Sequence, residues 1–145
     1  MTQAAAFVRR VLPAPPEVVF DEWLDAEGMA EWMCPRPARA TAIVIEPRVG
    51  GALRIDVEDT GVSVYVTGTF LELERPRLLR FTWSSSDWAD PSAQSVVTVH
   101  LEGHGSGETL MTIAHEQLPP DEVTNYQDGW ALIAVQLASA RLALP

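Results

Sequence analysis

Six segments with strand character follow one another between residues 40 and 116, and no helical pattern interrupts them. The clearest covers residues 52–59, where apolar and charged side chains alternate, as in a strand with one buried face. Short turns join the segments, among them the glycine-rich GHGSG at 103–107, so we expect successive strands to pair antiparallel. This run predicts one antiparallel sheet and leaves room for helices only at its two ends.

Helical patterns stand before and after the strands. A first strand at 7–12 leads into a helix that opens with Pro15-Pro16, and we expect Gly28 to end it before a second short helix at 29–33. After the last strand, residues from about 122 to 144 predict one long helix. Strands segregated from helices indicate an α+β fold with six to seven strands.

The longest strand segment, residues 61–74, changes phase along its length. Its three spaced valines share one face, whereas its two leucines follow in the opposite phase. The change falls near Gly68 and Phe70. We therefore expect a bulge or a sharp bend at that point.

The final helix contains a glycine, Gly129, directly before Trp130. Glycine inside a helix costs about 1 kcal/mol relative to alanine. The helix is apolar on nearly all sides, so we expect burial on more than one side, by a curled sheet or by a dimer contact. We interpret Gly129 as a close approach to another backbone or to the first helices, which predicts that Gly129→Ala destabilises the protein through a clash.

Charge narrows the range of partners. The 145 residues include 20 acidic and 10 basic side chains, for a formal net charge of −10. A field of this sign repels nucleic acids and anionic lipid headgroups, so we expect no nucleic-acid binding and no membrane insertion. Cys34 is the single cysteine, and the first 20 residues lack the apolar run of a signal peptide. A cytoplasmic protein is the default expectation.

Five ordered segments carry a family resemblance. They read APPEVVFDEWLDAEGMAEWMCP, PRVGGALRI, GTFLELERPRLLRFTW, TLMTIAHEQL and GWALIAVQL. Together they resemble the family related to activators of the 90-kDa heat-shock protein ATPase, within the START/SRPBCC superfamily, whose fold is like that of the birch pollen allergen. The resemblance spans nearly the whole chain and implies a single domain over residues 1–145.

The resemblance also implies a helix-grip fold, in which a curved antiparallel sheet wraps a long C-terminal helix and leaves a cavity between them. Many small members of the superfamily bind apolar small molecules. The eukaryotic activators carry an additional N-terminal domain that grips the chaperone, and 145 residues leave no room for it. A chaperone contact is therefore an alternative and not the leading expectation.

Large rings are the first candidates to line such a cavity, because Trp, Tyr and Phe commonly wall ligand sites. Aromatic stripes are more often core than pocket, but the implied cavity favours the pocket. The predicted ligand-binding residues are Phe20, Trp23, Trp32, Phe70, Phe81, Trp83, Trp88, Met111, Ile113, His115, Tyr126, Trp130 and Ile133.

The three histidines and the cysteine are the candidates for catalysis or metal binding. His115 shares its strand phase with two apolar residues, so it is either a polar group in the cavity or a solvent-facing residue at a strand end. His100 and His104 fall at a strand end and in a turn, where a spacing of four does not give one shared face, so we expect no metal site. We interpret Cys34 as a buried or half-buried thiol and not as a nucleophile.

The loop SSSDWADPSA places Asp87 and Asp90 on either side of Trp88. It is either a mobile lip at the mouth of the cavity or a plain surface loop with a partly exposed tryptophan.

The leading functional prediction is a protein that binds an apolar or lipid-like small molecule without catalysis. Two alternatives remain: an interaction module like the chaperone-ATPase activators, and a hydrolase or cyclase that works in the cavity. We expect no cofactor, and the sequence leaves a homodimer open.

Overall fold

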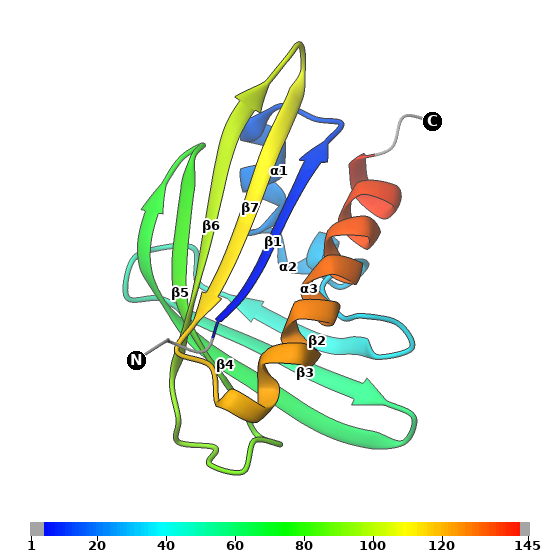
Figure 1. Ribbon diagram of the computed structural model, residues 1–145, viewed down its shortest axis with the longest axis vertical. Helices are drawn as coiled ribbons and strands as arrows, with labels where there is room; N and C mark the ends of the chain where they lie inside the picture. The colour runs from blue at the N-terminus through cyan, green and yellow to red at the C-terminus, as the bar shows by residue number, and fades with distance from the viewer. Residues whose placement is uncertain (1–4, 143–145) are drawn as a thin grey trace.

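The computed structural model describes residues 5–142, and its strands form one seven-stranded sheet in the order β1-β7-β6-β5-β4-β3-β2 (Figure 1). All neighbouring strands pair antiparallel. The elements are β1 (Ala5–Leu12), α1 (Pro16–Glu22), α2 (Ala26–Met29), β2 (Arg39–Ile45), β3 (Ala52–Asp59), β4 (Val62–Glu74), β5 (Leu78–Ser85), β6 (Ser95–His104), β7 (Glu108–Glu116), η1 (Pro120–Glu122), α3 (Val123–Leu137) and η2 (Ala138–Leu142). The predicted α+β class and the antiparallel run are confirmed.

The sheet curves, and the long helix α3 lies on its inner side (Figure 1). A 3₁₀ turn, η1, leads into α3, and a π-helical turn, η2, continues it. The helix-grip arrangement is therefore confirmed. The predicted helix end at residue 144 lies outside the described residues.

The break between the first two helices differs from the prediction. α1 ends at Glu22 and α2 begins at Ala26, so Gly28 lies within the second helix and does not separate the two. Asp25 sets the boundary, because its side chain accepts a hydrogen bond from the Gly28 backbone N–H at 3.1 Å and so caps α2. The expected helix at 29–33 was therefore placed about three residues too late; residues 30–32 form a turn after α2.

The expected irregularity in β4 is present. The pairing of β4 with β5 shifts register between Phe70 and Glu72, as a β-bulge does. Two residues before Phe70, strands β4 and β5 come very close: a Cβ added to Gly68 would lie 2.0 Å from the carbonyl oxygen of Thr82. Only glycine fits at such a contact, so Gly68 is a true close-approach glycine.

α3 buries one face and leaves another exposed. Trp130, Ile133 and Leu137 are buried, whereas Leu132 and Val135 are 39% and 41% exposed. Within the chain the sheet therefore buries one side of α3, and burial of the flank that carries Leu132 and Val135 by a dimer contact stays a prediction. Within residues 5–142, no helix combines the length and the apolar character needed to cross a lipid bilayer.

Candidate ligand-binding pocket

A pocket of about 180 Å³ lies between α3, the strands β3 to β5 and the segment that precedes β2. α3 and η1 contribute Glu122, Asn125, Tyr126, Gly129, Trp130 and Ile133 to its wall. The segment before β2 contributes Met33, Cys34, Pro35 and Ala38. The strands and the loop after β5 contribute Ile55, Val57, Asp59, Val64, Val66, Trp83, Ser85 and Asp87.

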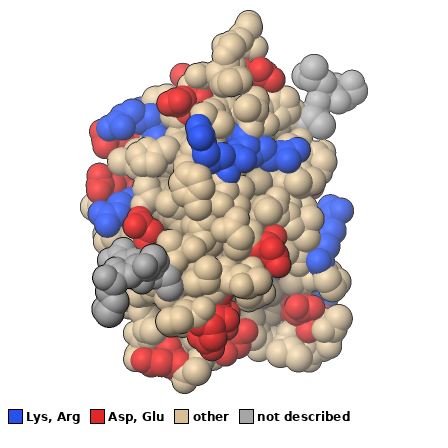
Figure 2. All heavy atoms as spheres, viewed as in Figure 1, with Lys and Arg blue, Asp and Glu red and all other residues tan. Residues whose placement is uncertain are grey.

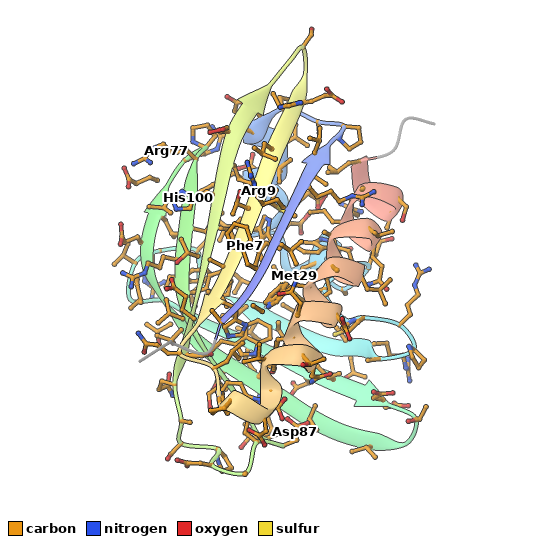
Figure 3. The ribbon with its side chains drawn as sticks, viewed as in Figure 1. Phe7, Arg9, Met29, Arg77, Asp87 and His100 are labelled. Atoms are coloured by element: carbon orange, nitrogen blue, oxygen red, sulfur yellow. The ribbon has the colours of Figure 1, made fainter. Side chains whose placement is uncertain are left out.

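The two ends of the pocket differ in character. Its interior is formed by buried apolar side chains such as Ile55, Val66 and Ile133. Its outer end carries carboxylates: Asp59 and Asp87 are exposed and Glu122 is half-buried. Acidic side chains gather around the start of α3 (Figure 2), and Asp87 lies below the first turn of that helix in the same view (Figure 3). The pocket is therefore apolar inside and negative at its mouth.

The structure brings four of the predicted ligand-binding residues to this pocket. Trp83, Tyr126, Trp130 and Ile133 all line it. The other nine are buried elsewhere in the core and do not contribute to the wall: Phe20, Trp23, Trp32, Phe70, Phe81, Trp88, Met111, Ile113 and His115.

Contacts among the rings explain this division. The Trp23 ring centre lies 5.0 Å from that of Trp32 and 6.1 Å from that of Trp130, so Trp23 packs behind the pocket wall. Phe81 packs edge-on against Phe70 at 5.7 Å. Edge-to-face packing of this kind stabilises a solid core. Most of the large rings therefore fill the interior, and only those on one side of the cluster face the pocket.

His115 lies at the centre of a buried chain of hydrogen bonds. The indole N–H of Trp130 donates to its Nδ1 at 3.0 Å, which leaves the ring hydrogen on Nε2, 2.7 Å from the Ser95 hydroxyl. That hydroxyl in turn donates to the Trp83 carbonyl oxygen at 2.7 Å. Burial lowers the pKa of His115 from 6.5 to about 3, so the ring is neutral.

This network decides between the two interpretations of His115. The residue is 0% exposed, so the solvent-facing alternative is wrong. It points into the interior, but both ring nitrogens are engaged and the ring lies behind the pocket wall. A neutral, doubly hydrogen-bonded imidazole is poorly suited to act as a general acid or base.

Tyr126 presents a phenol to the pocket. Its oxygen accepts a hydrogen bond from the Trp83 indole N–H at 3.0 Å. Burial raises the pKa of Tyr126 to about 12, although the hydrogen bond from Trp83 lowers it, so the phenol keeps its proton. Among the described residues no acceptor is in hydrogen-bonding position for that proton, so the hydroxyl has a free donor.

Cys34 also lines the pocket, 8% exposed. Burial raises the pKa of its thiol to about 11, which keeps the thiolate fraction small at neutral pH. The predicted inert, buried thiol agrees with this position. Among residues 5–142 no group of three or more His, Cys, Asp or Glu side chains is placed to hold a metal ion.

The loop after β5 is pinned to the sheet. The Ser84 hydroxyl donates to the Pro91 carbonyl oxygen at 2.8 Å, and Ser85 bonds the Asp87 carboxylate. Trp88 is 3% exposed and packs edge-on against Tyr126, with ring centres 6.0 Å apart. The alternative of a plain loop with a partly exposed tryptophan is therefore wrong, and Asp87 forms part of the pocket rim.

Gly129 lies inside α3 and faces the pocket. A Cβ added to it would meet only the Pro35 Cγ, at 3.8 Å, which is an ordinary van der Waals contact. The predicted clash for Gly129→Ala is therefore wrong. The glycine leaves space at the pocket wall and is not required by backbone crowding.

Several wall residues were missed by the sequence reasoning, although a signal for some of them was present. Ile55 and Val57 lie on the inward face of the alternating strand at 52–59, and Val64 and Val66 lie on the shared face of the next one. Selecting aromatic residues left these aliphatic ones out. The contributions of Pro35 and Ala38 had no such signal, because they depend on how an irregular segment crosses the opening.

The family model described as activator of Hsp90 ATPase homolog 1-like protein matches residues 13–140, so the chain belongs to that family. No curated protein sequence matches the chain significantly.

Solved structures share the fold. Protein CV1439 from Chromobacterium violaceum is 26% identical, with a TM-score of 0.83 over 97% of this chain and 99% of its own. The AHSA1 protein SPO3351 from Silicibacter pomeroyi is 23% identical, with a TM-score of 0.82 over 94% of this chain and 96% of its own. An Hsp90 activator from Plasmodium falciparum is more distant, 21% identical with a TM-score of 0.65 over 96% of this chain and 89% of its own.

Proposed function

We propose that this protein binds a small apolar molecule in the pocket between α3 and strands β3 to β5. The observation that carries the proposal is the pocket itself. It holds about 180 Å³, is partly open to solvent, and has an inner wall of buried apolar side chains beside a closely packed aromatic core, which is the usual character of a ligand site.

Gly129 supports the same proposal. Alanine would fit at this position and is the better helix former, by about 1 kcal/mol. A helix that keeps glycine at the pocket wall gives up stability and gains open space. A loss of stability of this kind is expected at positions that serve binding and not folding.

Catalysis has weaker support. A hydrolase or cyclase needs a nucleophile or an acid–base group poised toward substrate. His115 lies behind the wall with both nitrogens engaged, and the Cys34 thiol is protonated at neutral pH. The Plasmodium protein is described as an Hsp90 activator. At 21% identity its similarity to this chain supports a shared fold and does not extend that activity to this protein.

Native mass spectrometry of the purified protein tests the proposal, with ethylbenzene titration as a second readout. We expect either a retained small molecule or saturable binding of ethylbenzene. Gly129→Leu places a side chain at the pocket wall and should abolish binding. Ala131→Leu, on the exposed side of the same helix, is the matched control and should bind as the wild type does. Equal binding by both variants, or no binding by the wild type, would refute the proposal.

A further inference from the structure

The mouth of the pocket carries negative charge without a balancing cation. Asp59, Asp87 and Glu122 are the charged groups on the wall, and none of the described lining residues is Lys, Arg or His. The carboxylates bond neutral groups instead: Asp87 accepts from Ser85, and Glu122 accepts from the Asn125 side chain at 3.3 Å. An anionic ligand would meet like charges at the entrance, which disfavours its binding.

The pocket wall also offers a hydrogen-bond donor. The Tyr126 oxygen already accepts from Trp83, and the phenol keeps its proton, so what remains for a ligand is the O–H. Tyr126 is half-buried at the pocket wall, so a ligand acceptor that displaces water there gains a hydrogen bond from this O–H. The wall therefore favours a ligand with an acceptor atom near Tyr126.

The size of the pocket limits the ligand further. Its 180 Å³ is slightly more than the cavity of about 150 Å³ that holds benzene. It is less than the range of roughly 300 to 1,000 Å³ that is typical for drug-sized ligands. A compact body of about one ring fits this space, and a long acyl chain does not.

From these three features we infer that the pocket selects a compact, uncharged apolar molecule with one hydrogen-bond acceptor, such as a carbonyl or ether oxygen, and rejects carboxylates. The acceptor bonds the Tyr126 hydroxyl, and the acidic mouth supplies the discrimination. This inference rests on the proposed function, because it names the ligand class of the same site.

Three probes with one ring each test it by NMR titration of the ¹⁵N-labelled full chain at pH 7: acetophenone, ethylbenzene and benzoate. Acetophenone should bind about three- to tenfold more tightly than ethylbenzene, the usual net effect of one hydrogen bond. Benzoate should bind at least about tenfold more weakly than acetophenone, because its charge meets the acidic mouth. Equal affinities for benzoate and acetophenone would overturn the inference.

Two sets of variants test the Tyr126 hydroxyl and the acidic mouth separately. Tyr126→Phe should remove the preference for acetophenone, so that its affinities for acetophenone and ethylbenzene come to within about twofold of each other. The combined variant Asp59→Asn, Asp87→Asn and Glu122→Gln should raise the affinity for benzoate relative to that for ethylbenzene, whereas Asp128→Asn, exposed and outside the pocket, should leave this ratio as it is in the wild type.

The outcomes are distinguishable. If Tyr126→Phe weakens both neutral probes equally, or if removing the charges does not help benzoate, the inference is wrong although the pocket binds ligand. If none of the probes binds the wild type although native mass spectrometry finds a retained molecule, the inference alone is wrong; if neither is found, the proposed function fails and the inference with it. Should Tyr126→Phe not fold, the charge variants still decide the rejection of carboxylates.

Discussion

Gln127 holds both backbone polar groups of Phe7. The Phe7 N–H donates to the Gln127 Oε1 at 2.8 Å, and the Gln127 Nε2 donates to the Phe7 carbonyl oxygen at 2.7 Å. Phe7 lies on β1, the first strand of the sheet order and therefore an edge (Figure 3). An open edge is a template for pairing with another chain, so the Gln127 amide takes the place of a neighbouring strand at that point.

Gln127→Ala is expected to lower the free energy of unfolding by about 1 to 3 kcal/mol, since two hydrogen bonds of about 0.5–1.5 kcal/mol each are lost. Urea unfolding measures the change, and amide exchange at Phe7 should become faster. Gln127→Glu keeps an acceptor for the Phe7 N–H but loses the donor to its carbonyl, so it should fall between wild type and alanine. An unchanged amide exchange rate at Phe7 would show that the Gln127 side chain does not protect this edge of β1.

His115 should make stability depend on pH. Its folded pKa of about 3 lies below the unfolded value of 6.5, so between these pH values only the unfolded chain takes up the proton. Stability from this residue is thus present above pH 6.5 and is lost as the pH falls toward about 3, with a slope of up to about 1.4 kcal/mol per pH unit.

The His115 contribution is measured as the difference between wild type and His115→Gln in urea unfolding from pH 7 to pH 4. The two curves should converge as the pH falls, because glutamine does not titrate and the carboxylates are common to both proteins. Parallel curves would show that His115 binds a proton equally in both states.

Gly129→Ala is expected to stabilise the protein by up to about 1 kcal/mol, because alanine fits the site and favours the helix. Thermal or urea unfolding measures this. Ala131→Gly, the reverse change at an exposed position of the same helix, should destabilise by a similar amount. A loss of stability in Gly129→Ala would show that a side chain at this position does clash.

Arg141 should matter more than an ordinary surface arginine. It bonds Glu22 at 2.8 Å, whose side chain is only 11% exposed, and it also pairs with Asp25 and Glu31. Arg141→Met leaves Glu22 without its partner and should cost about 1–3 kcal/mol. Arg75→Met breaks the exposed pair between Arg75 and Asp21, whose side chains are 55% and 59% exposed, and should leave stability nearly unchanged. Equal losses in urea unfolding would contradict the distinction.

Much of the fold was predictable because it follows from local patterns. Alternation at 52–59 and the phase change near Gly68 translate directly into a half-buried strand and a bulge. The helix boundary at Asp25 was missed because a capping carboxylate competes with a helix-breaking glycine three residues later, and the cap determines where α2 begins. Such local competition is not visible in periodicity.

The pocket was predictable only in part. Trp83 and Trp130 face it, whereas Trp23 and Trp32 pack behind them, and nothing in residue type separates the two pairs. The separation depends on how far the sheet curls and on which side of the aromatic cluster is left open. Gly129 was misjudged for the same reason, because a missing side chain indicates either a close approach or an empty space.

The buried chain of hydrogen bonds behind the pocket wall makes part of that wall rigid. The indole nitrogens of Trp130 and Trp83 are tied to His115 and Tyr126, so the two largest rings of the wall are held in one orientation before anything enters. For the proposed ligand, this fixed wall would reduce the conformational entropy lost on binding. Steric fit against these two fixed rings would therefore add to the selection by charge and by the Tyr126 hydroxyl that we propose.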